Sequence, residues 1–323
     1  MTIVKNLAAV GVARQAAKGT PAAQPQFFFG LRGGNAITVD LDQSEEERTL
    51  AAKRSAPGVN RLKVVHGMQF TARLHPRTIG LLVYGALGAI ATSGSGPFTH
   101  VETPAGDLPY LTFWGQFAGG IYRVQDCKID ELSIKWDGPG PLEVDVTAWG
   151  GVPGYPSSIT PVVDEQFADY YQAGGGTFKI DSNSGTPAVA PITKGEIKIS
   201  NGVEPLILAT SVVPQDVIIG HQSIELGLTL VPDDLAHWRA IVTGTDSGTT
   251  ISEAPVYGSY DQLFVLGTNS LQVVGNRVAF AADFPEVDPA GGASELELVG
   301  TAVLGTAGAD ALTATVINAH ASY

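Results

Sequence analysis

The sequence is poor in cysteine and in charged residues, and it has no long apolar run. Its single cysteine, Cys127, cannot form an internal disulfide, and this usage indicates synthesis in a reducing compartment. No stretch reaches the length of a membrane span, and the short apolar segment 7–13 is interrupted as a signal peptide by Arg14. We therefore expect neither secretion nor a membrane partner.

Signatures of catalysis and of metal or cofactor binding are also missing. The histidines show no HxH or HExxH spacing, and there is no CxxC pair. The sequence contains no Walker A loop, no Rossmann glycine fingerprint and no G-x-S-x-G elbow. We expect no catalytic residue, no cofactor and no metal, and hence no enzyme.

The charge balance disfavours a protein that grips nucleic acid. The formal net charge is −13, with 19 basic and 32 acidic residues, whereas phosphate binding requires clustered Lys and Arg. An acidic surface past which DNA moves stays possible, because a wall that repels phosphate cannot trap it. Solubility alone would also explain this balance.

The residues that are abundant favour a protein rich in short strands. The chain has 39 glycines and 20 prolines, and only 16% of its 323 residues are charged. This composition is typical of strands joined by tight turns. The hydrophobic fraction of 44% argues against global disorder.

One unit of strand followed by helix occurs twice. In the segment 221–244, four apolar residues alternate from Ile224 to Leu230, Pro232 ends the strand, Asp233 or Asp234 can cap a helix, and Gly244 stops it. The segment 66–88 repeats this pattern without a gap at a constant shift of 232 − 76 = 156 residues. We interpret the two units as an internal duplication.

A predicted hairpin lies between the two units. The strands 128–136 and 142–149 each alternate apolar and polar residues across the turn 137–141. Trp136 falls on the inward stripe of this hairpin and Trp238 on that of the second helix, so we expect core packing for both rather than a sugar-stacking role. The opposite face carries Glu131, Lys135, Glu143 and Asp145, the pattern of an antiparallel sheet with one wet side.

The N-terminal region predicts an arm, a strand and a long loop. The first 23 residues are small and weakly polar, which suggests an arm over the surface or against a neighbour. Phe27, Phe28 and Phe29 either anchor this arm or end a core strand. We predict a strand over 35–42 with Ile37, Val39 and Leu41 facing inward, followed by an exposed excursion over 44–60.

The boundary between the halves falls in a region rich in proline and glycine. We predict a first half over 1–152, a linker over 153–176 with a short helix at 164–172, and a second half over 177–323. Further strands are predicted at 195–200, 206–213, 263–266, 271–279 and 295–304.

Several segments together resemble the major tail tube proteins of long-tailed, siphovirus-like bacteriophages. They are VARQAAKGTPA, HGMQFTARLHP with IGLLVYGALG, THVETPAGDLPYLTF, and VVPQDVIIGHQSIELGLTLVPDD. The resemblance implies a mainly β fold, an antiparallel β-sandwich or partial barrel with short flanking helices, here internally duplicated. It also implies a structural virion protein that assembles with itself into stacked, hexameric rings. Genomic double-stranded DNA would pass through the lumen without specific binding.

The same resemblance implies partners and a location. The expected partners are further copies of the chain and other tail proteins, such as the tape measure and the tail terminator. The expected location is the virion tail, after assembly in the host bacterial cytoplasm.

The candidate functional residues follow from the polar strand faces and the long loop. Either Glu143 and Asp145 or the face with Glu225 and Thr229 lines the lumen, and the latter group, which includes Gln69, Thr71 and Arg73, could instead face a neighbour. For ring stacking we predict the loop residues Glu45, Glu46, Glu47, Lys53 and Arg54. Two alternatives stay open: a carbohydrate-binding β-sandwich, motivated by the tryptophans, and a hydrolase on a jelly roll.

Overall fold

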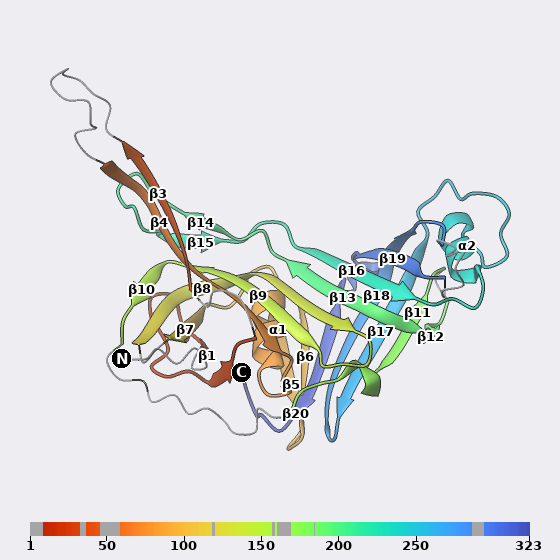
Figure 1. Cartoon of the computed structure of the whole chain (residues 1–323), viewed down its shortest axis with the longest axis horizontal. Helices are drawn as coiled ribbons and strands as arrows, with labels where there is room; N and C mark the ends of the chain where they lie inside the picture. The colour runs from red at the N-terminus through yellow and green to blue at the C-terminus, as the bar shows by residue number, and fades with distance from the viewer. Residues whose placement is uncertain are drawn as a thin grey trace.

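A computed structural model describes residues 9–32, 37–45, 59–117, 120–156, 159, 169–183, 185–285 and 294–323. Within these residues the fold is mainly β, and every strand pair is antiparallel. Figure 1 shows an elongated molecule whose first and second halves lie side by side along the long axis. The predicted class, an antiparallel β-sandwich with short flanking helices, is confirmed.

The first half contains eleven of the described elements. They are β1 (Ala9–Arg14), β2 (Phe27–Gly30), β3 (Thr38–Glu45), β4 (Val59–Arg73), α1 (Ile79–Leu87), β5 (Gly88–Ser93), β6 (Phe98–Pro104), β7 (Leu111–Phe117), β8 (Gly120–Asp137), β9 (Glu143–Gly150) and β10 (Val152–Gly154).

The second half follows the same plan with two short 3₁₀ turns. Its elements are η2 (Ala173–Gly175), β11 (Thr177–Asp181), β12 (Ala188–Val189), β13 (Ile192–Ser200), β14 (Glu204–Leu206), β15 (Asp216–Ile218), β16 (Ser223–Leu230), α2 (Ala236–Thr243), β17 (Tyr257–Leu266), β18 (Asn269–Ala282), β19 (Leu296–Ala302), η3 (Thr306–Gly308) and β20 (Thr313–Asn318).

The strands of the two halves pair in the same order. In the first half the order is β2-β1-β7-β8-β9-β4-β3. In the second half it is β12-β11-β17-β18-β19-β16-β13. The long strands β8 and β18 hold the same place, and each also carries a short strand, β10 or β20, on its first part. The repeated strand and helix read from the sequence are β4 with α1 and β16 with α2.

The halves are joined by two strand pairs. In one, β20 pairs with β6, with Ala314 opposite Glu102. The other joins the main sheets. The first strand of the second-half repeat, β13, adds to the free edge of β8, with Ser200 opposite Glu131 and Lys194 opposite Asp137. The result is one continuous sheet in the order β3-β4-β9-β8-β13-β16-β19-β18. We call it the eight-stranded sheet.

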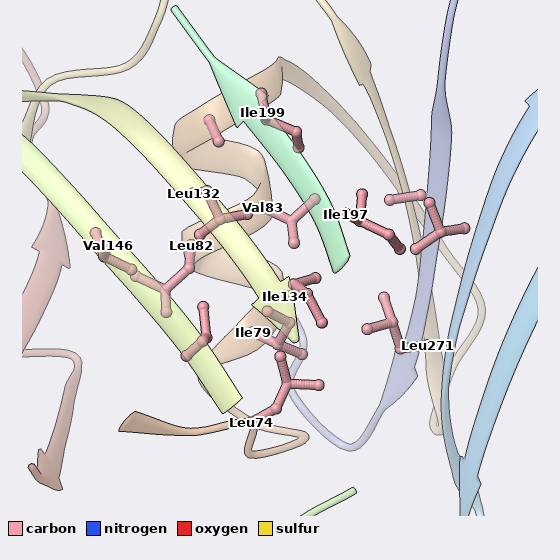
Figure 2. Close-up of a cluster of buried hydrophobic side chains, with 14 of the residues drawn as sticks. Leu74, Ile79, Leu82, Val83, Leu132, Ile134, Val146, Ile197, Ile199 and Leu271 are labelled. Carbon is pink, nitrogen blue, oxygen red and sulfur yellow. The ribbon is translucent and has the colours of Figure 1, made fainter. Parts of the chain in front are cut away.

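The main core lies beneath this sheet, around α1. The helix sequence IGLLVYGAL is apolar on every side, so it can be stable only where all sides are covered, and all nine residues are buried. Figure 2 shows Ile79, Leu82 and Val83 of α1 packed under β8, β9 and β13, with Leu271 of β18 nearby. The core is therefore shared between the halves.

The second helix, α2, lies at the opposite end of the molecule from β3 and is largely uncovered (Figure 1). Only Ala240 in it is buried. The N-cap is Leu235, so neither Asp233 nor Asp234 is the cap as predicted. Asp234 lies one residue earlier, and its carboxylate accepts the Ala236 amide at 2.8 Å. Gly88 and Gly244 end the two helices with φ of 102° and 83°, where a side chain would be strained, so the predicted stop glycines are confirmed.

The predicted N-terminal arm is wrong over residues 9–14, whereas most of 16–23 is exposed. Residues 9–14 form β1, which is paired on both sides, by β2 and β7, and is buried from Ala9 to Ala13. Small side chains suit this position because strands and side chains approach closely there; Gly11, for example, lies against Pro25. Phe27, Phe28 and Phe29 are buried in β2, the core-strand alternative.

Two strand predictions also differ from the structure. In β3, Val39 and Leu41 do not face a core: their exposed fractions are 46% and 50%, because β3 and β4 project from the body as a hairpin (Figure 1). Of the predicted strand 206–213, only Leu206 lies in a strand, β14. The rest is the connection to β15. In it the Ser211 hydroxyl donates to the Val213 carbonyl and accepts from the Val213 amide.

Part of the predicted linker 153–176 packs into the first half. Most of the predicted helix 164–172, namely residues 164–168, lies outside the described residues, but 169–172 are not helical. Tyr171 is buried between two strand ends: its amide donates to Leu74 O, and its carbonyl accepts from Leu142 N, both at 3.0 Å. These bonds satisfy backbone groups that the ends of β4 and β9 would leave open.

Candidate functional site

The outward side of the eight-stranded sheet is a continuous charged surface. Alternate residues of β4, β9, β8, β13, β16 and β19 point away from the core, as the period of two in their burial shows. We call this surface the polar face. Its charged residues on these strands, with Arg32 reaching in beside β4, are Glu131, Asp137, Glu143, Asp145, Glu196, Glu225, Glu297, Arg32, Arg73, Lys135, Lys194 and Lys198.

The polar face brings together all four residues predicted to line a lumen. Asp145 and Glu225 stand in one row across the sheet, separated by Ser133 and Lys198 on the strands between them. On β9, Glu143 lies two residues before Asp145 and points to the same side. On β16, Thr229 lies four residues after Glu225, again on the same side. The sequence left two strand faces as alternatives, and they are parts of the same surface.

The remaining predicted residues on this face are also adjacent to them. Thr71 lies opposite Asp145 and donates its hydroxyl to that carboxylate. Arg73 lies opposite Glu143, and its guanidinium stacks over the Tyr170 ring at 4.4 Å. Arg73 is therefore held by an aromatic ring at one margin of the polar face.

Ion pairs across neighbouring strands hold most of the cations. Lys135 lies 2.8 Å from Asp145 and 3.4 Å from Glu196, and the hydrogen bond to Asp145 raises the pKa of Lys135. Lys198 lies 3.0 Å from Glu131, whose hydrogen bond raises the pKa of Lys198 in the same way. These ammonium groups are engaged by carboxylates from adjacent strands, so they are poorly placed to trap a passing phosphate.

The polar face carries little net charge. Seven acidic and five basic side chains give 5 − 7 = −2, against −13 for the whole sequence. A shallow hollow of about 600 Å³ lies on this face, between Arg32 and Glu143 on one side and β16 and β19 on the other. Arg32 closes the first side by pairing with Glu143. Opposite charges alternate along this surface, which is only weakly acidic.

Arg32, Glu196 and Lys198 are among the polar-face residues that sequence reasoning missed. Arg32 precedes β3 and gives no periodic signal, because its place depends on the backbone bond from its amide to Thr71 O at 2.9 Å. Glu196 and Lys198 had a usable signal: the alternation in the predicted strand 195–200 places both on the side opposite Ile197 and Ile199.

The four tryptophans do not gather on one exposed face. Trp114 and Trp136 are buried, Trp136 against Phe178 and Phe264, and this confirms the predicted core role of Trp136. Trp149 packs on a small cluster beneath β15, and Trp238 contacts Phe284 beside α2. The observation that motivated a sugar-binding surface is thus accounted for by packing.

The predicted stacking loop lies mostly outside the described residues. Glu46, Glu47, Lys53 and Arg54 fall there, and of Glu45 the structure places the backbone, opposite Val59 at the end of the β3–β4 hairpin. Among the described residues, no group of three or more His, Cys, Asp or Glu side chains is arranged to hold a metal ion. Neither α1 nor α2, the α-helices of the described part, has the length and apolar character of a membrane span.

The fold and the polar face together define a class of protein. It is a duplicated antiparallel β-sandwich whose main sheet, within the part of the chain that the structure describes, ends at unpaired strand edges, an architecture suited to building larger sheets from copies of itself. The sequence model of the family described as phage tail tube protein matches residues 5–316, and the chain belongs to this family. It is thus a structural protein of the bacteriophage tail. No curated protein matches the chain at a significant level.

Proposed function

We propose that this chain assembles with itself into stacked rings that form the phage tail tube, and that genomic DNA passes through their lumen. The observation that carries this proposal is the eight-stranded sheet, in which one half already completes the edge of the other. The remaining edges, at β3 and at the end of β18, can be completed by further copies. Family membership supports the same role.

We further propose that the polar face lines the lumen. Glu143, Asp145, Glu225 and Thr229 would then point toward the DNA. A weakly acidic, ion-paired wall suits passage, because free cations would bind phosphates and a strongly negative wall would repel them. DNA would be a transient occupant and not a specifically bound ligand.

The circumference of the tube wall depends on the number of chains in the ring and on the number of strands that each chain contributes. The resemblance to the family implies six chains, which would place 6 × 8 = 48 strands around the ring. Three chains would place 24, and at about 4.8 Å per strand the two walls measure about 230 and about 115 Å around. Barrels of about 16–18 strands already hold an aqueous channel, so the smaller ring also leaves a lumen.

The contacts between rings are proposed from the sequence. We propose that the loop carrying Glu45, Glu46, Glu47, Lys53 and Arg54 contacts the next ring. Because Glu45 and Val59 face each other across the hairpin, a two-residue Asn-Gly turn can replace 46–58 without changing the register. Single rings without tubes would support the assignment, and normal tubes would remove it. The tape measure and tail terminator are proposed partners, and the host cytoplasm is the proposed place of assembly.

Electron microscopy of the purified protein tests the main proposal. We expect rings or tubes with a central channel, and native mass spectrometry should give 6 × 33.6, about 202 kDa, or 3 × 33.6, about 101 kDa, for one ring. A chain that stays monomeric at high concentration, without added tail proteins, would count against the tube. A glycan-binding assay addresses the carbohydrate-binding alternative, and we expect no retention.

A further inference from the structure

The pairing of β13 with β8 joins the two halves, and this joint is seen once within the chain. At this joint β13 adds to the distal part of β8. Glu196 faces Lys135, the two charges lying 3.4 Å apart, and the Trp136 side chain covers Gly195. Because both halves have the same pairing order, each partner at this joint has a counterpart elsewhere in the chain.

The counterpart of the β8 edge is the end of β18. Leu142 bonds the end of β4 at Leu74, and Leu296 lies opposite Leu230 at the end of β16, so residue 143 corresponds to 297. Lys135 faces Glu143. Ala282 faces Leu298, so the next residue, Asp283, comes opposite Glu297 and takes the place of Lys135. Phe284 then corresponds to Trp136.

The counterpart of β13 is the segment that carries Arg32. Glu196 pairs with Gly227 of β16, and Gly227 corresponds to Thr71 of β4 at the shift of 156. The residue bonded to Thr71 is Arg32, through its amide. Arg32 therefore occupies the position in the first half that Glu196 occupies in the second half, and its charge is opposite.

The matching part of β8 is covered by β13, whereas the end of β18 is left exposed. Trp136 is 4% exposed, whereas Phe284 is 59% exposed. Pairing of β17 with β18 stops at Ala279, so within the described residues the strand beyond it is paired on one side alone, by β19. A hollow of about 460 Å³ lies at this edge, lined by Asp283, Phe284 and Pro285 together with Glu297 and Val299.

The connections that follow β13 and the Arg32 segment differ in the same way, because one is covered by the rest of the chain and the other is exposed. In the second half, residues 201–222 fold back onto the first half: Asn201 and Val203 bond Asp130, and Val217 packs against Leu108. The matching connection in the first half is the β3–β4 hairpin, which projects from the body with Leu41 and Leu62 each 50% exposed. It lies toward the other end of the molecule from α2 (Figure 1).

We propose that the joint is repeated between chains, with a second copy as the occupant of the β18 edge. The Arg32 segment of one copy adds to the end of β18 of the next and places Arg32 opposite Asp283. The β3–β4 hairpin then lies over the second half of that next copy. The contact is head-to-tail, so repetition closes a ring or extends a filament. This inference rests on the proposed self-assembly and specifies the surface that performs it.

Cysteine cross-linking tests the predicted register. The double variant Arg32→Cys with Asp283→Cys should form intermolecular disulfides under mild oxidation, because facing strand residues have Cα atoms within disulfide range. A non-reducing gel should show a ladder whose last band counts the chains in the ring. The native Cys127 is buried and should not interfere. The cysteine pair Lys135→Cys with Glu196→Cys, at the matching site within one chain, is the positive control and should close without changing the oligomer.

The outcomes separate this inference from the tube proposal. Each single variant alone should give no ladder, and the two mixed should give dimers. Tubes that form without a ladder, while the control pair closes, would overturn the inference and leave the tube intact. If the double variant does not assemble, hydrogen exchange on wild-type tubes decides: the amides of 280–283 should become protected on assembly, and unchanged exchange there would overturn it. A wild-type chain that forms no rings would instead remove the tube proposal.

Discussion

Trp136 and Gly195 face each other where β13 of the second half pairs with β8 of the first, and the indole occupies the space that a Cβ on residue 195 would need. The same indole stacks on Phe178 at 5.5 Å and meets Phe264 at 5.8 Å, both in the second half. A side chain of the first half thus completes the core of the second. The joint is tightly packed, and a side chain on residue 195 would meet the indole of Trp136.

We expect Gly195→Ala to destabilise the joint. The added methyl group would force the indole off Phe178, and overpacking of this kind costs about 1–3 kcal/mol. Urea unfolding of the unassembled chain measures the change in the free energy of unfolding. Gly227→Ala on the neighbouring strand is the control, because a Cβ there meets nothing within 4 Å, and it should change stability by less than about 0.5 kcal/mol.

A second prediction concerns the connection 201–222 and its anchor, Asn201. The Asn201 side-chain amide donates to Ala86 O at 3.0 Å and to Ile129 O at 2.9 Å, and its oxygen accepts from Gln222 at 2.9 Å. Asn201→Ala removes this bridge between the end of α1, β8 and the connection. Since each buried group left unpaired costs about 1–3 kcal/mol, we expect a loss of about 2–4 kcal/mol in unfolding free energy.

The control for Asn201 is an asparagine with an exposed bond. Asn183 donates to Asp246 at the surface, at 3.1 Å, and Asn183→Ala should change stability by less than about 0.5 kcal/mol. Equal effects of the two substitutions would show that Asn201 is not an anchor.

Strands with a regular alternation could be predicted from the sequence. The predictions failed where the burial of a strand depends on which other segments pack against it. Strong alternation placed β8, β9, β16 and β19 correctly, because one buried face imposes a period of two. Val39 and Leu41 alternate just as well but lie on a projecting hairpin, so periodicity identified a strand without saying what covers it. The N-terminal strand β1 was missed because small side chains carry little hydrophobic signal.

The candidate site was predictable to a similar extent. Strand alternation alone assigned Glu143, Asp145 and Glu225 to wet faces, and the structure places them on one surface. That the two predicted faces are continuous depends on the pairing of β13 with β8, residues far apart in sequence. No local pattern reports such a long-range pairing.

A third prediction tests whether the polar face borders the DNA. The double substitution Glu143→Lys with Asp145→Lys adds two cations, removes the carboxylate that holds Arg32 and leaves Lys135 with Glu196 alone. Exposed ion pairs contribute about 0–1 kcal/mol each, so we expect tubes to assemble normally. Free cations on the lumen wall should bind phosphate and slow DNA ejection, most strongly at low salt.

The matched control places the same charge change elsewhere. Glu204 and Glu253 are exposed and lie off the polar face, and Glu204→Lys with Glu253→Lys should leave the rate of ejection unchanged. The rate is measured on phage carrying each variant. Wild-type ejection by the Glu143 and Asp145 variant would remove these residues from the lumen.

The last prediction concerns Glu102, a carboxyl group buried in β6 between Ile90 and Ala314. Neither of its oxygens has a hydrogen-bond partner among the residues that the structure describes. Burial raises the pKa of Glu102 well above its ordinary value. The side chain therefore stays protonated in the folded chain at a pH where the unfolded chain has already lost this proton.

The sign of the pH dependence follows from this difference. Below the unfolded pKa both states hold the proton, and this group contributes no slope. Above it the folded state binds more protons than the unfolded state, so the free energy of unfolding falls as pH rises, by up to about 1.4 kcal/mol per pH unit, until the folded pKa is reached. Glu102→Gln cannot ionise, so its stability relative to wild type should increase from pH 5 to pH 8 in urea unfolding. Any fixed cost of the buried amide is the same at both pH values and cancels in that comparison. Glu204→Gln, at an exposed site, should show no such trend, and parallel stability curves for wild type and Glu102→Gln would contradict the assignment of a protonated, buried carboxyl group.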